Sequence, residues 1–174
     1  LNNTAVFEQL LSTIIHEYAH ILSLNSSQVD YDLDQKRADE DPFMSIEDYE
    51  AVTIRAEERC LRAHGIYDGN ACFRPGSYMY DFYLSFWDGY GEDVLNLAAR
   101  GQVFDRNEDD FVNSYAGSSP SEDFAETFAA WLMPDVEDFD ITSRVHEKFN
   151  FFAGRPSLMR VRKQIHEGLV RVRS

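Results

Sequence analysis

The sequence predicts a single, mainly α-helical and soluble domain over residues 1–174. The chain has 174 residues, 44% of them hydrophobic and 14% aromatic, which is enough to build one buried core. Apolar side chains recur mostly at helical spacing, and the β-branched runs are short. No stretch approaches the roughly 20 apolar residues that a membrane span needs. We therefore expect helices, little or no sheet, and no membrane span.

The first expected helix covers about residues 5–24. Its apolar positions recur at a period of 3.6 residues, which predicts a wide buried face. These positions are Val6, Leu10, Leu11, Ile14, Ile15, Tyr18, Ile21 and Leu22. A second helix is expected from Ser45, where Asp48 is placed to complete a capping box, to about His64.

Four more helices are expected further along the chain, over 77–90, 119–133, 142–152 and 156–172. The first of them is rich in aromatic residues at core spacing, and the second has a core face of Phe124, Phe128 and Leu132. The remaining acidic stretches, 30–42 and 105–110, are expected to be loops. Asp30, Asp32 and Asp34 alternate as at the start of a calcium loop, but Gln35 stands where that loop needs glycine. We expect a solvated acidic loop there.

Net charge argues against a nucleic-acid function for the body of the protein. The chain has 16 Lys and Arg against 31 Asp and Glu, a net charge of −15, so it lacks a cationic surface for phosphate contacts. The segment 155–174 differs, because it holds six basic residues and one acidic residue. The simplest interpretation is that the basic helix 156–172 docks on the acidic body; nucleic-acid binding by this tail alone is the other interpretation.

Cys60 and Cys72 are the two cysteines of the chain, with Gly65 and Gly69 between them. These glycines let the chain turn, so that the thiols can meet. One interpretation is a disulfide, which would stabilise the fold by roughly 3 kcal/mol and imply an oxidising compartment. The alternative is a pair of buried free thiols.

Residues 16–20, His-Glu-Tyr-Ala-His, form an H-E-x-x-H motif inside the apolar first helix. Residues four apart share one helix face, so His16 and His20 can converge on one Zn²⁺. Glu17 points away from that pair and can take a proton from water. Two core histidines satisfied by neighbours are the structural alternative, but burying two His and a Glu costs several kcal/mol unless they are paired.

A catalytic zinc site usually needs a third protein ligand. His64 is available at the end of the second helix, but Glu122 is the better candidate, because Glu122 and Glu126 lie one turn apart on an apolar helix. Glu122 has another interpretation, as the capping-box residue of a helix that begins with Ser119 and Pro120. Glu126 is expected to accept a hydrogen bond from the other ring nitrogen of a ligand histidine.

The H-E-x-x-H motif and the segment Tyr115…Glu122-x-x-Ala125-Glu126-x-Phe128 together resemble the gluzincin metallopeptidases. The likeness is to the branch of the lethal factor catalytic domain and the Pro-Pro endopeptidase, and to secreted or lipid-anchored bacterial zinc-binding metallopeptidases. It runs along most of the chain, but only these two segments are specific.

This resemblance implies a zincin-like catalytic domain and a role for five residues of the two segments. His16, His20 and Glu122 would bind zinc, Glu17 would be the general base, and Tyr115 would stabilise the oxyanion. Taken without the resemblance, Tyr115 is a loop aromatic that covers the core.

Zincins have a β-sheet before the H-E-x-x-H helix, whereas only fifteen residues precede His16. We expect either an upstream segment that carries this sheet or a minimal, mostly helical version. The first residue, Leu1, favours a chain cut from a longer precursor, and the resemblance implies a secreted or cell-envelope protein.

The sequence thus predicts a zinc-dependent endopeptidase that acts on a peptide or protein substrate. Two rivals stay open. One is a catalytically inactive binding module in which zinc holds two helices together, and the other is an acidic helical interaction domain without a metal.

Overall fold

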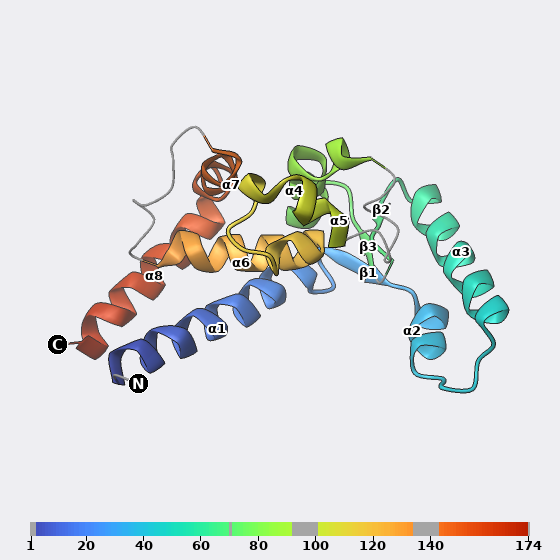
Figure 1. Ribbon diagram of the computed structural model, residues 1–174, viewed down its shortest axis with the longest axis horizontal. Helices are drawn as coiled ribbons and strands as arrows, with labels where there is room; N and C mark the ends of the chain where they lie inside the picture. Colours follow the sequence, from blue (N-terminus) through green and yellow to red (C-terminus); the bar gives the residue numbers. More distant parts are fainter. Residues whose placement is uncertain (1–2, 70, 92–100, 134–142, 174) are drawn as a thin grey trace. The chain divides into compact units, whose positions relative to one another are not determined.

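The computed structural model describes residues 3–69, 71–91, 101–133 and 143–173, and it is mainly helical (Figure 1). The chain divides into two compact units. The first joins Leu1–His20 to Gly101–Ser174, and the second is Ile21–Arg100. The mainly α fold class is confirmed, while the single domain over 1–174 stays a prediction. Within the described residues, no helix combines the length and the apolarity that crossing a membrane requires.

The described part of the first unit is mainly helical. Helix α1 begins in this unit and its last residues belong to the second. The helices are α1 (Asn3–Leu24), α5 (Gly101–Arg106), α6 (Pro120–Leu132), α7 (Arg144–Ala153) and α8 (Pro156–Arg173), with 3-10 turns η3 (Glu108–Asp110) and η4 (Ala116–Ser118). Helix α8 confirms the expected basic helix. The expected helix 142–152 corresponds to α7, capped by Ser143, while residue 142 lies outside the described residues.

Helix α6 forms the centre of the first unit. Ser119 caps it by accepting a hydrogen bond from the Glu122 backbone N–H at 3.2 Å, and Pro120 follows at the first helical position. Phe124 and Phe128 are fully buried, and both pack edge-on against Phe152 of α7, with ring centroids 5.1 and 5.4 Å apart. The expected core face of this helix is therefore confirmed.

A buried ion pair also joins α7 to α6. The Lys148 Nζ atom lies 2.7 Å from Asp123 Oδ2 and donates to the Asp110 backbone carbonyl at 2.7 Å, and both side chains are 0% exposed. Burial lowers the pKa of Lys148, and the charge of Asp123 opposes this shift. The Thr127 hydroxyl donates to the other Asp123 oxygen at 2.9 Å. The ionised groups therefore have polar partners on several sides.

The apolar face of α1 is less buried than its pattern predicts. Ile15 and Ala19 are buried, but Leu10 and Ile14 are each 57% exposed and Ile21 is 65% exposed. The expectation of a wide buried face is therefore wrong. Helical periodicity shows which residues share a face, but burial also requires a neighbouring element, and it is the side with Ile15 and Ala19 that is covered.

The second unit combines a small antiparallel sheet with short helices. Its strands are β1 (Val29–Tyr31), β2 (Ile66–Tyr67) and β3 (Ala71–Phe73), in the order β1-β3-β2. Its helices are α2 (Leu33–Asp39), α3 (Ile46–Arg62) and α4 (Tyr78–Phe86), followed by the 3-10 turn η1 (Asp88–Tyr90). Ser45 and Asp48 cap α3 as expected, with the Asp48 N–H donating to Ser45 Oγ at 3.1 Å.

The expected acidic loops are partly regular structure. Asp30 belongs to β1 and pairs with Arg74, while Asp32 caps α2 and lies 2.6 Å from the Arg59 guanidinium. Residues 105–110 likewise contain the end of α5 and η3. The expectation of loops is therefore wrong for these parts of the two stretches. The Asp30 and Asp32 carboxylates serve as an ion-pair partner and a helix cap, and a high density of acidic residues in the sequence does not reveal such roles.

Cys60 and Cys72 form a disulfide between α3 and β3. Gly65 lies against it, because a Cβ at this position would contact both sulfur atoms and would come 2.8 Å from the Phe73 carbonyl oxygen. Gly69, by contrast, has φ 96° and permits the turn between β2 and β3. Of the two alternatives left open by the sequence, the structure has the disulfide.

Removing this disulfide should destabilise the protein. We expect Cys60→Ser/Cys72→Ser to lower the free energy of unfolding by about 3 kcal/mol, because the bridge closes a short loop in the unfolded chain. Urea unfolding of the oxidised, reduced and doubly substituted proteins measures this difference. Equal stability of the oxidised and reduced proteins would contradict the expectation.

Candidate metal centre

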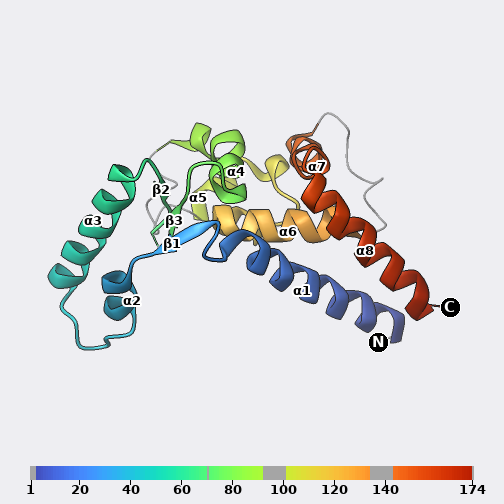
Figure 2. The ribbon, with the colours of Figure 1, turned by 180° about the vertical axis from the view of Figure 1, so that it is seen from behind.

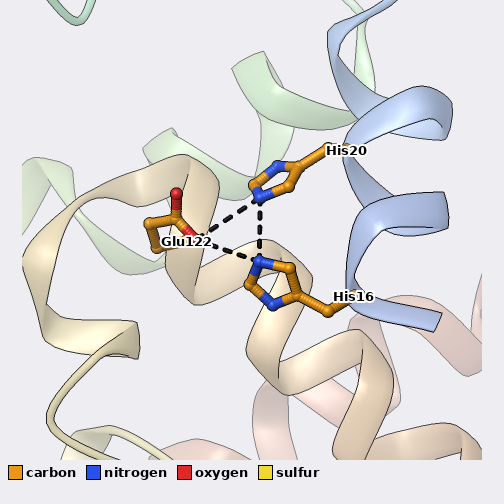
Figure 3. Close-up of side chains that lie close together, drawn as sticks. All are labelled: His16, His20 and Glu122. Atoms are coloured by element: carbon orange, nitrogen blue, oxygen red, sulfur yellow. Dashed lines mark hydrogen bonds and ion pairs between the residues drawn. The ribbon is translucent and has the colours of Figure 1, made fainter. Parts of the chain in front are cut away.

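Three side chains from two helices of the first unit converge on one point. His16 and His20 lie one turn apart on α1, and Glu122 lies in the first turn of α6. Figure 3 shows both imidazole rings and the carboxylate turned toward one another. In Figure 1 and in the reverse view of Figure 2, α6 lies beside α1. The sequence spacing therefore brings the histidines together, and packing of α6 adds the carboxylate.

The distances among the three side chains match those of metal ligands. The two Nε2 atoms are 3.0 Å apart, and Glu122 Oε2 lies 3.2 Å from His16 Nε2 and 3.3 Å from His20 Nε2. Ligand atoms about 2.0–2.1 Å from a tetrahedral zinc are separated by about 3.3 Å. The three atoms thus form a nearly regular triangle of the size that one small ion needs.

The polar environment also fits a cation. Glu122 Oε2 is buried and accepts no hydrogen bond, although a buried carboxylate oxygen normally has a partner. The side chains of His16, His20 and Glu122 are 10%, 20% and 22% exposed. An ion bound by all three would satisfy this oxygen and both ring nitrogens. The group of His16, His20 and Glu122 can therefore hold a metal ion.

Of the two interpretations left open by the sequence, the Glu122 side chain follows the one in which it meets the histidines, and Glu122 takes part in the helix cap only through its backbone. Its backbone N–H donates to the capping Ser119 hydroxyl, while its carboxylate faces the histidines. His64, the other candidate for a third ligand, is not in this group; it is exposed, belongs to the second unit and has φ 58° after the end of α3.

Glu126 lies behind His16. Its Oε1 atom is 2.7 Å from His16 Nδ1, one turn along α6 from Glu122. A carboxylate in this position favours the tautomer with a proton on Nδ1, which leaves the Nε2 lone pair free for a metal. The structure thus brings Glu126 to the place expected from the sequence. It also adds Asn113, which donates from Nδ2 to the second Glu126 oxygen at 2.6 Å.

Glu17 and Tyr115 line a cavity of about 290 Å³ beside the metal group. The other residues of its wall are Gln9, Ser12, Thr13, His16 and Glu126. The Tyr115 side chain is 54% exposed, so it does not cover the core, and its ring centroid lies 6.0 Å from that of His16. Desolvation, followed by the charge of Glu122 and a hydrogen bond with it, raises the pKa of Tyr115.

A short 3-10 turn holds Tyr115 at this wall. Turn η4 follows Tyr115 directly and packs on α5 without a side chain at Gly117, where a Cβ would come 2.9 Å from Phe104 Cδ2. The Ala116 N–H donates to Asn113 Oδ1 at 2.9 Å at the start of the turn. Asn113 could not be predicted from the sequence, because no helical spacing connects a residue outside the helices with Glu126.

Comparison with known proteins gives no match: no family model, curated protein or solved structure matches this chain.

Proposed function

We propose that this protein is a zinc-dependent endopeptidase of the gluzincin type, with a zincin-like catalytic domain. The observation that carries the proposal is the convergence of His16, His20 and Glu122 beside a cavity that also has Glu17 and Tyr115 in its wall. Two imidazoles and a carboxylate are a ligand set used by catalytic zinc, which keeps a fourth position open. Zinc in this group would supply a Lewis acid that activates water and polarises a peptide carbonyl.

The protein's own side chains provide the remaining chemistry. Glu17 accepts a proton from the attacking water and then delivers it to the leaving amine. The Tyr115 hydroxyl donates a hydrogen bond to the oxygen that becomes negatively charged. A phenol carries its proton at neutral pH, so this hydroxyl can act as a donor. Glu126 holds His16 in the tautomer that ligation requires.

The disulfide supports a secreted or cell-envelope location, because such bonds persist in oxidising compartments. The substrate in this proposal is a peptide or a protein.

Metal analysis and peptide digestion test the proposal. We expect one zinc per chain in the purified protein and cleavage of a peptide library that a zinc chelator abolishes and added zinc restores. Substitution Glu122→Gln should weaken zinc binding well beyond the about 10–100-fold that loss of an outer hydrogen bond costs, because it removes a ligand. Asp109→Gln, at an exposed acid in η3, is the control and should leave the affinity unchanged.

Each of the other outcomes favours a rival. Zinc bound without any cleavage would support the binding module, in which the ion joins α1 to α6. Protein that binds no zinc, and whose stability added zinc does not change, would contradict the proposal and leave the metal-free interaction domain.

A further inference from the structure

We infer that Asn113 is a positioning residue for the metal centre, acting on His16 through Glu126. This inference rests on the proposed function, because it assumes that His16 binds zinc. The three side chains form a continuous chain of polar contacts from Asn113 Nδ2 through the Glu126 carboxylate to His16 Nδ1, at 2.6 and 2.7 Å.

Each group in this chain has a single role that matches its chemistry. An amide nitrogen can only donate, so the Asn113 Nδ2 group holds one Glu126 oxygen. The other Glu126 oxygen lies 2.7 Å from His16 Nδ1, close enough to take part in an ion pair with the ring. The Glu126 carboxylate, 24% exposed, is thus held from both sides, and its rotation would release the ring of His16. Hydrogen bonds to a charged acceptor of this kind are among the stronger ones.

The position of Asn113 is fixed independently of Glu126. Its Oδ1 atom accepts the Ala116 N–H at 2.9 Å, so both ends of the amide are used and the orientation of the amide group is determined. A side chain that closes a turn in this way has little freedom, and it presents its NH₂ group in one direction. Asn113 thereby connects the turn after Tyr115 with the histidine on α1.

Zinc affinity tests the inference on the full chain. We expect Asn113→Ala to weaken zinc binding about 10-fold, at the lower end of the range for outer-shell partners, as measured by competition with a chromogenic chelator. Asn113→Ser should show a similar loss. The serine hydroxyl can still accept a hydrogen bond from the Ala116 N–H, but the serine side chain is too short to reach Glu126. Asn150→Ala changes an exposed asparagine of α7 and should have no effect.

A double-mutant cycle separates this role from a merely structural one. If Asn113 acts through Glu126, the double variant Asn113→Ala/Glu126→Ala should bind zinc no more weakly than Glu126→Ala alone. If Asn113 only supports the turn, the two losses multiply, and Asn113→Ser binds zinc like the wild type. Multiplying losses, or an unchanged affinity in Asn113→Ala, would overturn the inference while leaving the proposed function intact.

Wild-type protein that fails to bind zinc would have a different meaning. It would remove the proposed function, and the inference with it. Circular dichroism of each variant without zinc establishes that the compared proteins are folded.

Discussion

Substitution of Glu17 by Gln should lower the rate of peptide cleavage by about 10²–10⁴-fold, because the amide cannot take a proton from water. The same variant should keep its zinc, because Glu17 is not among the three converging ligands. The side chain lines the cavity beside the metal group, so the change removes a proton acceptor and leaves the histidines in place. Cleavage rate and zinc content, measured on the same preparation, check both parts.

The control for Glu17→Gln comes from the same helix. Glu8 is an exposed glutamate of α1 that is not part of the cavity wall, and Glu8→Gln should cleave peptides like the wild type. A Glu17→Gln protein with full, chelator-sensitive activity would show that another group is the base. A variant that loses zinc together with activity would show that Glu17 acts in metal binding.

Substitution of Lys148 by Met should lower the free energy of unfolding by about 3–5 kcal/mol, the cost of leaving one partner of a buried pair without the other. Asp123 is 0% exposed, so its charge would stay buried after the lysine is removed. Urea unfolding with chelator present measures the change without a contribution from metal binding.

Two further proteins make this result interpretable. Lys148→Met/Asp123→Leu should recover most of the lost stability, because replacing both partners by apolar groups removes the buried charge. Lys163→Met removes an exposed lysine that lies 3.8 Å from Glu167, and it should cost less than about 1 kcal/mol. A small effect of Lys148→Met alone would contradict the view that this pair anchors α7 to α6.

The helices of this protein were predictable because their signals are local. Ser45 and Ser119 each cap a helix at the expected place, and the aromatic spacing of α4 and α6 matches their buried faces. The H-E-x-x-H pairing was predictable for the same reason, since residues four apart on a helix are always neighbours.

Most of the features that were missed are non-local, although the Asp32 cap of α2 is a local contact with the backbone N–H groups of Asp34 and Gln35. The exposure of Leu10 and Ile14 depends on which elements lie beside α1, and the structural roles of Asp30 and Asp32 depend on Arg74 and Arg59. Contacts between residues that lie far apart in the sequence cannot be derived from their spacing along the chain. The short strands also lack an alternating pattern long enough to recognise, because each has only two or three residues.

The sequence by itself determined how His16, Glu17 and His20 are placed relative to one another, since the geometry of a single helix sets the positions of these side chains. Only the tertiary structure decided that the Glu122 carboxylate joins the two histidines and that Asn113 donates a hydrogen bond to Glu126. A contact between α1 and α6 joins positions about a hundred residues apart, and its distances follow from the packing of whole helices.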